Sequence, residues 1–274
     1  MFGVSTMTMA AISQTSEPIT DAQRAFQGFD ESLRMFEKMI DRRGRLGKLY
    51  WLDDRPSYRK AVRELYAAVT PFVEDIATRF REKGSKDPSN LIESMAALGA
   101  GAEDMVNQCM HVFIAGTITT AMALSWIFAL LEAHPEVAQR LQTDVLEAFG
   151  TEEHPRRPFT SENIKAVPYI QSVILETLRL YPTSPNDSRF AACDTVLPVG
   201  GGPDGRGPLA VKKGTRVRLC MYYLHRRKDL WGEDADLFRP ERWEGSGKKR
   251  GWEYSAFSGG PGVCIGRESS FGYC

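Results

Sequence analysis

Cys264 lies in a glycine-rich run, Phe257 to Gly266 (FSGGPGVCIG), and its thiol could act as a metal ligand. Glycine lets the backbone adopt turns that other residues resist and lets it approach a flat group closely. Gly266 precedes the start of an expected helix, whose N-terminal N–H groups would lower the pKa of the thiol and favour the ligating thiolate. A lone cysteine is often only a small buried hydrophobe, so the residues around it decide its role.

Three further segments carry residues that could pair or line a cavity. Glu176 and Arg179 (in ETLR) are three positions apart, so on a helix they share a face and could form an ion pair. An exposed pair of this kind contributes only about 0.3–0.5 kcal/mol. Gly116, in AGTITT (115–120), would cost a helix interior about 1 kcal/mol relative to alanine and therefore needs a local reason. A threonine such as Thr119 in a buried helix most simply bonds back to its own backbone.

These segments and Phe238 to Trp243 (FRPERW) stand in an order that resembles the cytochrome P-450 family. FSGGPGVCIG is similar to the haem-binding signature FxxGxRxCxG, and ETLR is similar to the ExxR of the family's helix K. FRPERW is similar to the PERF or PERW element that follows, and AGTITT to the AGx(D/E)TT of the oxygen-binding helix I. The resemblance implies a haem-thiolate monooxygenase, which inserts one atom of dioxygen into a C–H bond and releases the other as water.

The resemblance gives several residues a place around haem b. Cys264 would be the axial thiolate ligand of the iron, and thiolate ligation favours cleavage of the O–O bond. Arg189, in NDSRFA, falls where the family often has an arginine on a haem propionate, which suits its planar fork; a surface arginine is the alternative. The remaining cofactor-binding residues of the loop would be Phe257, Gly260 and Gly266.

Other residues would act on oxygen or hold the loop. The resemblance implies that Thr119 steers protons to the bound oxygen and that Gly116 and Thr120 belong to the oxygen pocket. It also implies a buried structural network that fixes the cysteine loop against the core, because losing one partner of a buried network costs about 3–5 kcal/mol. The members of that network would be Glu176, Arg179 and Arg242.

Two positions depart from the family pattern, and a third residue is expected to be structural. Position 262 is glycine where the signature carries an arginine on a haem propionate, which should weaken haem retention by roughly 1.5–3 kcal/mol. Ile118 stands where an acid usually precedes the threonine, so proton delivery should be slower or depend on water. His225, in LHRR, is interpreted as a structural histidine rather than a ligand.

The resemblance covers nearly the whole chain but only about the C-terminal half of the family fold. It predicts a mainly α fold with a small β region, a partial cytochrome P-450 fold, as one incomplete domain over 1–274. Its helical part would be 1–182, and the β region, meander and haem-ligand loop would be 183–274. A membrane anchor, the first sheet strands and the haem-contacting helix C would lie upstream. The alternative is a catalytically inactive fragment that does not retain haem, and we expect the chain alone to bind haem poorly and not to turn over.

The expected partners and substrate also follow from the resemblance. Electrons would come from NADPH-cytochrome P-450 reductase, at the endoplasmic reticulum membrane on its cytosolic face. LPVGGGPDG, PERWE and FSGGPG resemble the fungal branch that hydroxylates alkanes and fatty acids, which implies a small apolar, long-chain substrate besides dioxygen. A basic run could help to dock an acidic partner or could be a solvated loop, with Arg242 internal. It comprises Arg239, Arg242, Lys248, Lys249 and Arg250.

Composition excludes several other classes. Lys+Arg and Asp+Glu both number 35, so the net charge is zero, which argues against a nucleic-acid-binding chain. The five cysteines are widely spaced without a CxxC pair, so neither a disulfide framework nor a zinc site is indicated. Met1 to Ser13 has neither the basic start nor the apolar core of a signal peptide or anchor, so membrane association would need an anchor outside this chain.

Periodicity and turn residues predict the elements that position these groups. Apolar side chains from Val62 to Ile76, including Phe72, indicate one buried helix face within 58–80, which Pro71 should bend or interrupt. Further helices are expected over 136–149 and 169–181, and strands near 209–211 and 215–220. Residues 105–131 lack Asp, Glu, Lys and Arg, which predicts a long helix through a protein interior; a single membrane span is the alternative.

Overall fold

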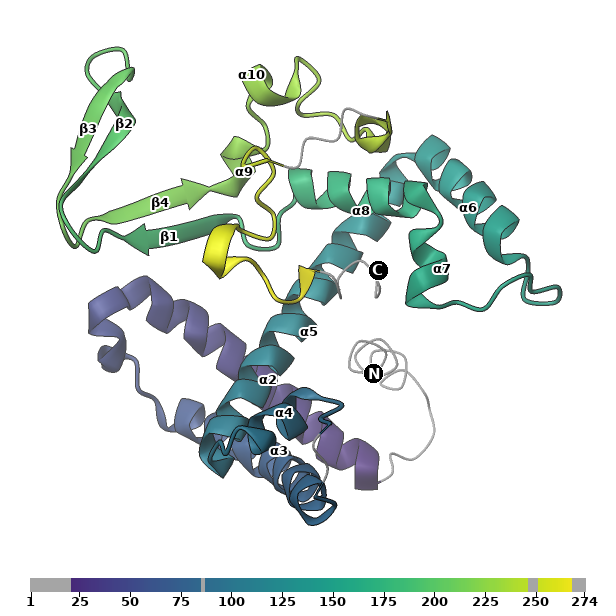
Figure 1. Cartoon of the computed structure of the whole chain (residues 1–274), viewed down its shortest axis with the longest axis vertical. Coiled ribbons are helices and arrows are strands. Elements are labelled where there is room, and N and C mark those ends of the chain that lie inside the picture. Colours follow the sequence, from purple (N-terminus) through teal and green to yellow (C-terminus); the bar gives the residue numbers. More distant parts are fainter. Residues whose placement is uncertain (1–20, 85–86, 246–250, 268–274) are drawn as a thin grey trace. The chain divides into compact units, whose positions relative to one another are not determined.

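The computed structural model describes residues 21–84, 87–245 and 251–267 (Figure 1). It is mainly helical with two small antiparallel sheets, which confirms the predicted fold class. Two compact units divide between Thr117 and Ile118, within one long helix, and each unit is described separately below. Met1 to Ser13, Lys248, Lys249 and Arg250 lie outside the described residues.

The first unit consists of helices around a core of aliphatic and methionine side chains. Its elements are α2 (Asp21–Leu46), η1 (Gly47–Leu52), α3 (Pro56–Glu82), α4 (Leu91–Ala97) and the beginning of α5 (Ala102–Ala133). Leu65 and Val73 of α3 pack with Met105, Val106 and Met110 of α5. Burial of one helix face against its neighbours is the main source of helix stability in proteins.

Two features of α3 differ from what the sequence suggested. Of the two expected effects of Pro71, a bend or an interruption, the interruption does not occur, because the helix continues from Pro56 to Glu82. The buried side chains Leu65 and Val73 lie on either side of the proline, so tertiary packing offsets the missing backbone hydrogen bond. Phe72, expected on the buried face, is 71% exposed, because Val73 and Ala77 provide the buried positions of this turn instead.

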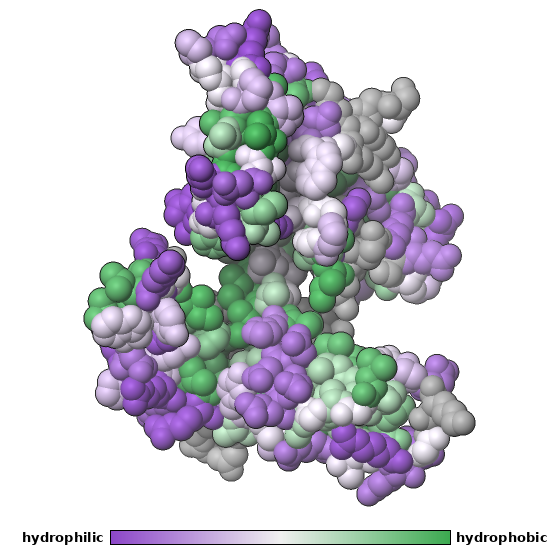
Figure 2. Space-filling view, turned by 60° about the vertical axis from the view of Figure 1, so that its left-hand side comes forward, coloured by the Kyte–Doolittle hydropathy of each residue, from purple (hydrophilic) through white to green (hydrophobic). Residues whose placement is uncertain are grey.

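Helix α5 contains the uncharged stretch 105–131 and is a single helix, as predicted. Its burial is confined to Met105, Val106 and Met110 in the first unit and to Ala123, Ile127 and Leu130 in the second. Only 17% of its most apolar stretch is buried, so in this structure it does not run through an interior as expected. By length and composition alone it could cross a membrane, a property it shares with many core helices. Its exposed apolar side chains include Val112, Met122, Trp126 and Phe128. Hydrophobic residues are visible at the surface of the molecule next to hydrophilic ones (Figure 2).

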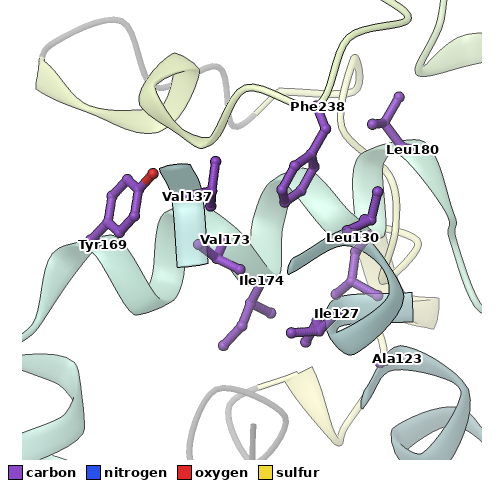
Figure 3. Close-up of a cluster of buried hydrophobic side chains, with 10 residues drawn as sticks. Ala123, Ile127, Leu130, Val137, Tyr169, Val173, Ile174, Leu180 and Phe238 are labelled. Atoms are coloured by element: carbon purple, nitrogen blue, oxygen red, sulfur yellow. The ribbon is translucent and has the colours of Figure 1, made fainter. Parts of the chain in front are cut away.

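The second unit is built on α8 (Pro168–Leu180), of which residues 172–180 are all buried. Before it come α6 (Pro135–Phe149) and α7 (Ser161–Lys165), and both α6 and α8 begin with a proline, which is favourable at the first helical position. Figure 3 shows Ile127 and Leu130 of α5 gathered with Val173 and Ile174 of α8 beneath Phe238. This cluster is the core against which the candidate site rests.

Two hairpin-like sheets and a meander follow. β1 (Asn186–Phe190) pairs with β4 (Arg216–Cys220), and β2 (Thr195–Gly201) pairs with β3 (Gly207–Val211), both antiparallel. The strands expected near 209–211 and 215–220 are present, whereas β1 was not predicted, because NDSRF has the composition of a turn. In its described residues the meander contains the short helical turns α9 (Met221–Leu224), α10 (Lys228–Trp231) and η2 (Pro240–Trp243), and a further turn, η4 (Gly260–Gly262), lies in the glycine-rich run that holds Cys264.

Candidate functional site

A buried ion pair on α8 is the structural centre of the site. Glu176 and Arg179 are both fully buried, and the pair is bidentate, with Nε to Oε2 and Nη2 to Oε1 each at 2.8 Å. Bidentate arginine–carboxylate pairs are strong and geometrically specific. Since both residues lie three apart on one helix, the pair needs no long-range contact to form.

The remaining N–H groups of Arg179 bind the meander. Nη1 donates to the backbone oxygens of His225 and Ala235, both at 2.6 Å, and Nη2 donates to that of Leu237 at 3.1 Å. Together with the two bonds to Glu176, these satisfy all five guanidinium N–H groups. One buried side chain of α8 therefore fixes the path of the meander at three points.

Glu176 holds the 239–243 segment in the same way. Its Oε1 accepts the backbone N–H of Arg239 at 3.0 Å and Nε of Arg242 at 3.3 Å, and its Oε2 accepts the indole N–H of Trp243 at 2.9 Å. Arg242 also donates to Asp234, and that hydrogen bond lowers the pKa of the Asp234 carboxyl. The structure thus brings Glu176, Arg179 and Arg242 together. The roles of Trp243 and Asp234 were missed, although Trp243 belongs to the FRPERW segment.

His225 connects this network to the cysteine loop. Its Nε2 accepts the backbone N–H of Ser255 at 3.0 Å, so Nδ1 carries the proton and donates to the backbone oxygen of Arg179, also at 3.0 Å. The ring is fully buried, and burial lowers its pKa from 6.5 to about 4. His225 is therefore a neutral structural residue, as its sequence context indicated, and it holds the chain two residues before Phe257.

The cysteine loop, Phe257 to Gly266, is closed by a backbone hydrogen bond, and its first residue packs in the core. Phe257 packs against the core cluster that contains Phe238, and its backbone oxygen accepts the N–H of Cys264 at 2.9 Å. Gly260 has φ +64, in the left-handed region that favours glycine. The side chain of Cys264 is exposed, and a Cβ added at Gly266 would lie only 3.7 Å from its Sγ. Glycine at 266 thus leaves that side of the thiol uncovered.

Arg189 reaches the same loop from β1. Its Nη2 is 3.4 Å from the hydroxyl oxygen of Ser258, and its Nη1 donates to Asp187 at 2.6 Å. A Cβ added at Gly262 would lie 3.3 Å from Nη2 of Arg189. The structure therefore brings Arg189 beside the loop, together with Asp187 and Ser258, which sequence reasoning missed because they lie about seventy positions apart.

The residues expected around oxygen lie on α5. Gly116 belongs to the first unit, and Thr119 and Thr120 belong to the second. Thr119 is exposed and Thr120 is half-buried, while a Cβ added at Gly116 would meet no atom within 4 Å. Packing in this structure therefore gives Gly116 no steric role, and the oxygen-pocket function of the three residues stays a prediction.

Cys264 is a single potential metal ligand, which suits a metal whose other ligands are supplied by an organic cofactor. In the described part of the chain, no group of three or more His, Cys, Asp or Glu side chains could hold a bare metal ion. A structural zinc site needs about four protein ligands, whereas haem iron needs one axial thiolate. Cys264 is an exposed thiol flanked by the exposed apolar side chains of Val263 and Ile265, the latter 88% exposed. A thiol on an apolar rim with a guanidinium nearby suits a flat, apolar group that carries carboxylates.

Comparisons with known proteins agree with this chemistry. The family model described as Cytochrome P-450 matches residues 3–269. The chain is 38% identical over 94% of its length to cytochrome P-450 monooxygenase alt2 of Alternaria solani, of which it covers 48%. It is 37% identical over 93% of its length to a cytochrome P-450 of Arthroderma benhamiae and 33% over 98% to cytochrome P-450 52A13 of Debaryomyces hansenii, and it covers 52% of each. The chain thus spans about half the length of these relatives, and it belongs to the cytochrome P-450 family.

Proposed function

We propose that this chain carries the haem-ligating part of a haem-thiolate monooxygenase that oxidises C–H bonds. The observation that carries the proposal is the exposed thiol of Cys264 in a glycine-rich loop tied to the buried Glu176–Arg179 pair. Haem b, once bound, supplies the activation of dioxygen. The chain's own part is to provide the axial thiolate at Cys264 and to hold it in place.

The other residues have proposed roles that follow from their positions. Phe257, Gly260 and Gly266 would shape the loop that receives the haem, and Arg189 would provide a guanidinium for one of its carboxylates. The hydroxyl of Thr119 would hold or pass a proton on the oxygen-binding side of the site, and Gly116 and Thr120 of α5 would contribute to the same pocket. Glu176, Arg179 and Arg242 do not touch the cofactor and act by fixing the meander and the loop.

The substrate and partners are proposed from sequence resemblance. The LPVGGGPDG segment, which covers the end of β2 and the turn that follows it, resembles the fungal alkane- and fatty-acid-hydroxylating branch, as do PERWE and FSGGPG. This resemblance favours a long aliphatic substrate. NADPH-cytochrome P-450 reductase would supply electrons, with the protein at the endoplasmic reticulum membrane on its cytosolic face. Arg239 is 53% exposed and would face an acidic partner only in addition to Asp234, with which it pairs at 2.8 Å, whereas Arg242 is 10% exposed and pairs with Glu176 and Asp234.

Two alternatives each rest on one observation. Gly262 lacks the guanidinium of the family signature, which favours a chain that does not retain haem. Helix α5 is long and apolar enough to span a bilayer, which favours a single-span membrane protein over 105–131. Full release from membranes by alkaline carbonate would exclude the second alternative.

A carbonyl-binding spectrum tests the proposal. The chain and a full-length version are reduced and exposed to carbon monoxide, and the red-shifted Soret band of a thiolate-ligated ferrous complex is expected in the full-length version. Cys264→Ala should abolish the band, and Cys193→Ala, which removes another exposed cysteine, should leave it unchanged. Absence of the band in the full-length version would overturn the haem-thiolate function, and its absence in the 274-residue chain alone would support the non-retaining alternative.

A further inference from the structure

We infer that Asp187 and Ser258 are positioning residues that hold the Arg189 guanidinium against the cysteine loop, in the space that glycine at position 262 leaves free. That Arg189 binds a haem propionate rests on the proposed function, whereas the position of its guanidinium is a property of this chain. Both residues lie in segments singled out in the sequence, NDSRFA and FSGGPGVCIG, but the motifs assigned neither of them a role.

The three side chains form a closed polar triangle between β1 and the loop. Asp187 and Arg189 are two positions apart on β1, so they project from the same face of the strand. Nη1 of Arg189 donates to Oδ1 of Asp187 at 2.6 Å, and the Ser258 hydroxyl donates to Oδ2 of the same carboxylate at 3.3 Å. The Ser258 oxygen in turn accepts from Nη2 of Arg189 at 3.4 Å.

The carboxylate is the member that orients the other two. Burial alone would raise the pKa of Asp187, but the hydrogen bonds from Arg189, the backbone N–H of Ser188 and Ser258 lower it, so Asp187 is ionised at neutral pH. An ionised carboxylate accepts hydrogen bonds only, which forces Arg189 and Ser258 to present their hydrogens to it. Nη2 of Arg189 thereby lies beside Ser258 and position 262, while the side chain as a whole remains 56% exposed.

Ser258 is where this triangle reaches the loop backbone. Its φ of +58 is uncommon for a residue other than glycine, and its N–H donates to the backbone oxygen of Ser255 at 3.0 Å. A strained conformation persists only where the surroundings determine it strongly, and the contact with Asp187 and Arg189 is one such determinant. Six residues later in the chain is Cys264, whose N–H closes the loop on Phe257.

Glycine at position 262 completes the arrangement. Because an added Cβ would lie 3.3 Å from Nη2 of Arg189, a side chain at this position would require the end of the guanidinium to shift by a few tenths of an ångström. An arginine at 262 would also place two like charges side by side. An arginine at 262 would therefore disturb the observed position of the Arg189 guanidinium.

An exposed ion pair by itself contributes little, so the test must separate positioning from ordinary surface pairing. Asp229 and Arg227 provide a control ion pair, since they also lie two positions apart and the arginine is 56% exposed in both pairs. Asp229 is more exposed than Asp187, and the control pair lies at the beginning of α10, away from the loop sequence. The first measurement is amide hydrogen exchange in the haem-free 274-residue chain. Asp187→Ala and Ser258→Ala should each accelerate exchange of the Cys264 and Ser258 amides about fivefold or more, and Asp229→Ala should not.

The second measurement is a double-mutant cycle on haem binding in the full-length version. Asp187→Ala and Arg189→Ala should each weaken haem binding about tenfold, and Asp187→Ala should have no further effect once Arg189 is alanine. Asp187→Asn, which keeps an acceptor, should recover part of the loss. Unchanged amide exchange, or additive effects in the cycle, would overturn the inference. Absence of haem binding in the unsubstituted protein would overturn the proposed function, and the exchange measurement would still decide the positioning.

Discussion

Nε2 of His225 accepts the backbone N–H of Ser255 at 3.0 Å, while Nδ1 of the same ring lies 3.0 Å from the backbone oxygen of Arg179. One neutral imidazole thus connects helix α8 with the start of the cysteine loop. Both ring nitrogens are used, one as donor and one as acceptor, so the arrangement exists only while the ring is uncharged. A second proton would place a donor against the Ser255 N–H.

This relationship predicts a specific loss of stability in acid. The pKa of His225 is about 4 in the folded chain, because burial disfavours the charged ring, against 6.5 without burial. Between these values the unfolded chain binds more protons than the folded one, so the free energy of unfolding falls as pH falls from about 6.5 to 4. The contribution of this one residue is on the order of 3 kcal/mol. Urea denaturation from pH 4.5 to 7.5 measures it.

The control for this prediction is His225→Gln, which cannot titrate. The substitution should be destabilising at pH 7.5, and the difference from the unsubstituted chain should shrink toward acid pH. Carboxylates contribute equally to both proteins and cancel in the comparison. Parallel stability curves at all pH values would show that His225 is not the neutral connector between α8 and Ser255.

Glu176 should be the least replaceable side chain of the network. Glu176→Gln removes the charge that compensates the buried Arg179 guanidinium and Arg242, with little change of shape. Breaking a buried pair costs about 3–5 kcal/mol, because the remaining charge stays desolvated. Equilibrium denaturation should show this loss, with an unchanged slope of the free energy of unfolding against denaturant concentration.

Glu244→Gln is the matched control, because Glu244 pairs with Arg140 at the surface, and it should lower the free energy of unfolding by less than about 1 kcal/mol. Equal effects of the two substitutions would contradict the structural role of Glu176.

Trp243 should contribute through its indole N–H as well as its area. It is 1% exposed, and the N–H donates to the Glu176 carboxylate at 2.9 Å. Trp243→Phe keeps an aromatic ring but removes a donor to a charged group, so a loss of about 1.5–3 kcal/mol is expected in the same denaturation measurement. Trp252, which is 71% exposed, provides the control, and Trp252→Phe should change stability by no more than about 0.5 kcal/mol. A neutral Trp243→Phe would mean that the hydrogen bond adds nothing.

The sequence predicts the parts of this site that are local or carried by a motif. Glu176 and Arg179 share one helix face, and the FRPERW segment contributes Arg242, so all three could be named before the fold was known. The partners Asp234 and Ser255 could not, because nothing local in their segments marks them and their contacts depend on how the meander returns to α8. Strand β1 was missed because polar residues there pair with β4, where tertiary context outweighs propensity.

Pro71 offers a test of how packing overrides a local signal. It lies exposed inside α3 and leaves the backbone oxygen four residues earlier without its helical donor, yet the helix continues to Glu82. Pro71→Ala restores that donor but also frees the unfolded chain, so a net gain of about 1–2 kcal/mol is expected from thermal or urea unfolding. Pro56→Ala is the control, because at the first helical turn the N–H has no helical partner, and it should change stability by less than about 0.5 kcal/mol. If Pro71→Ala destabilises the chain, the proline must instead set the path that allows Leu65 and Val73, on either side of it, to reach one core.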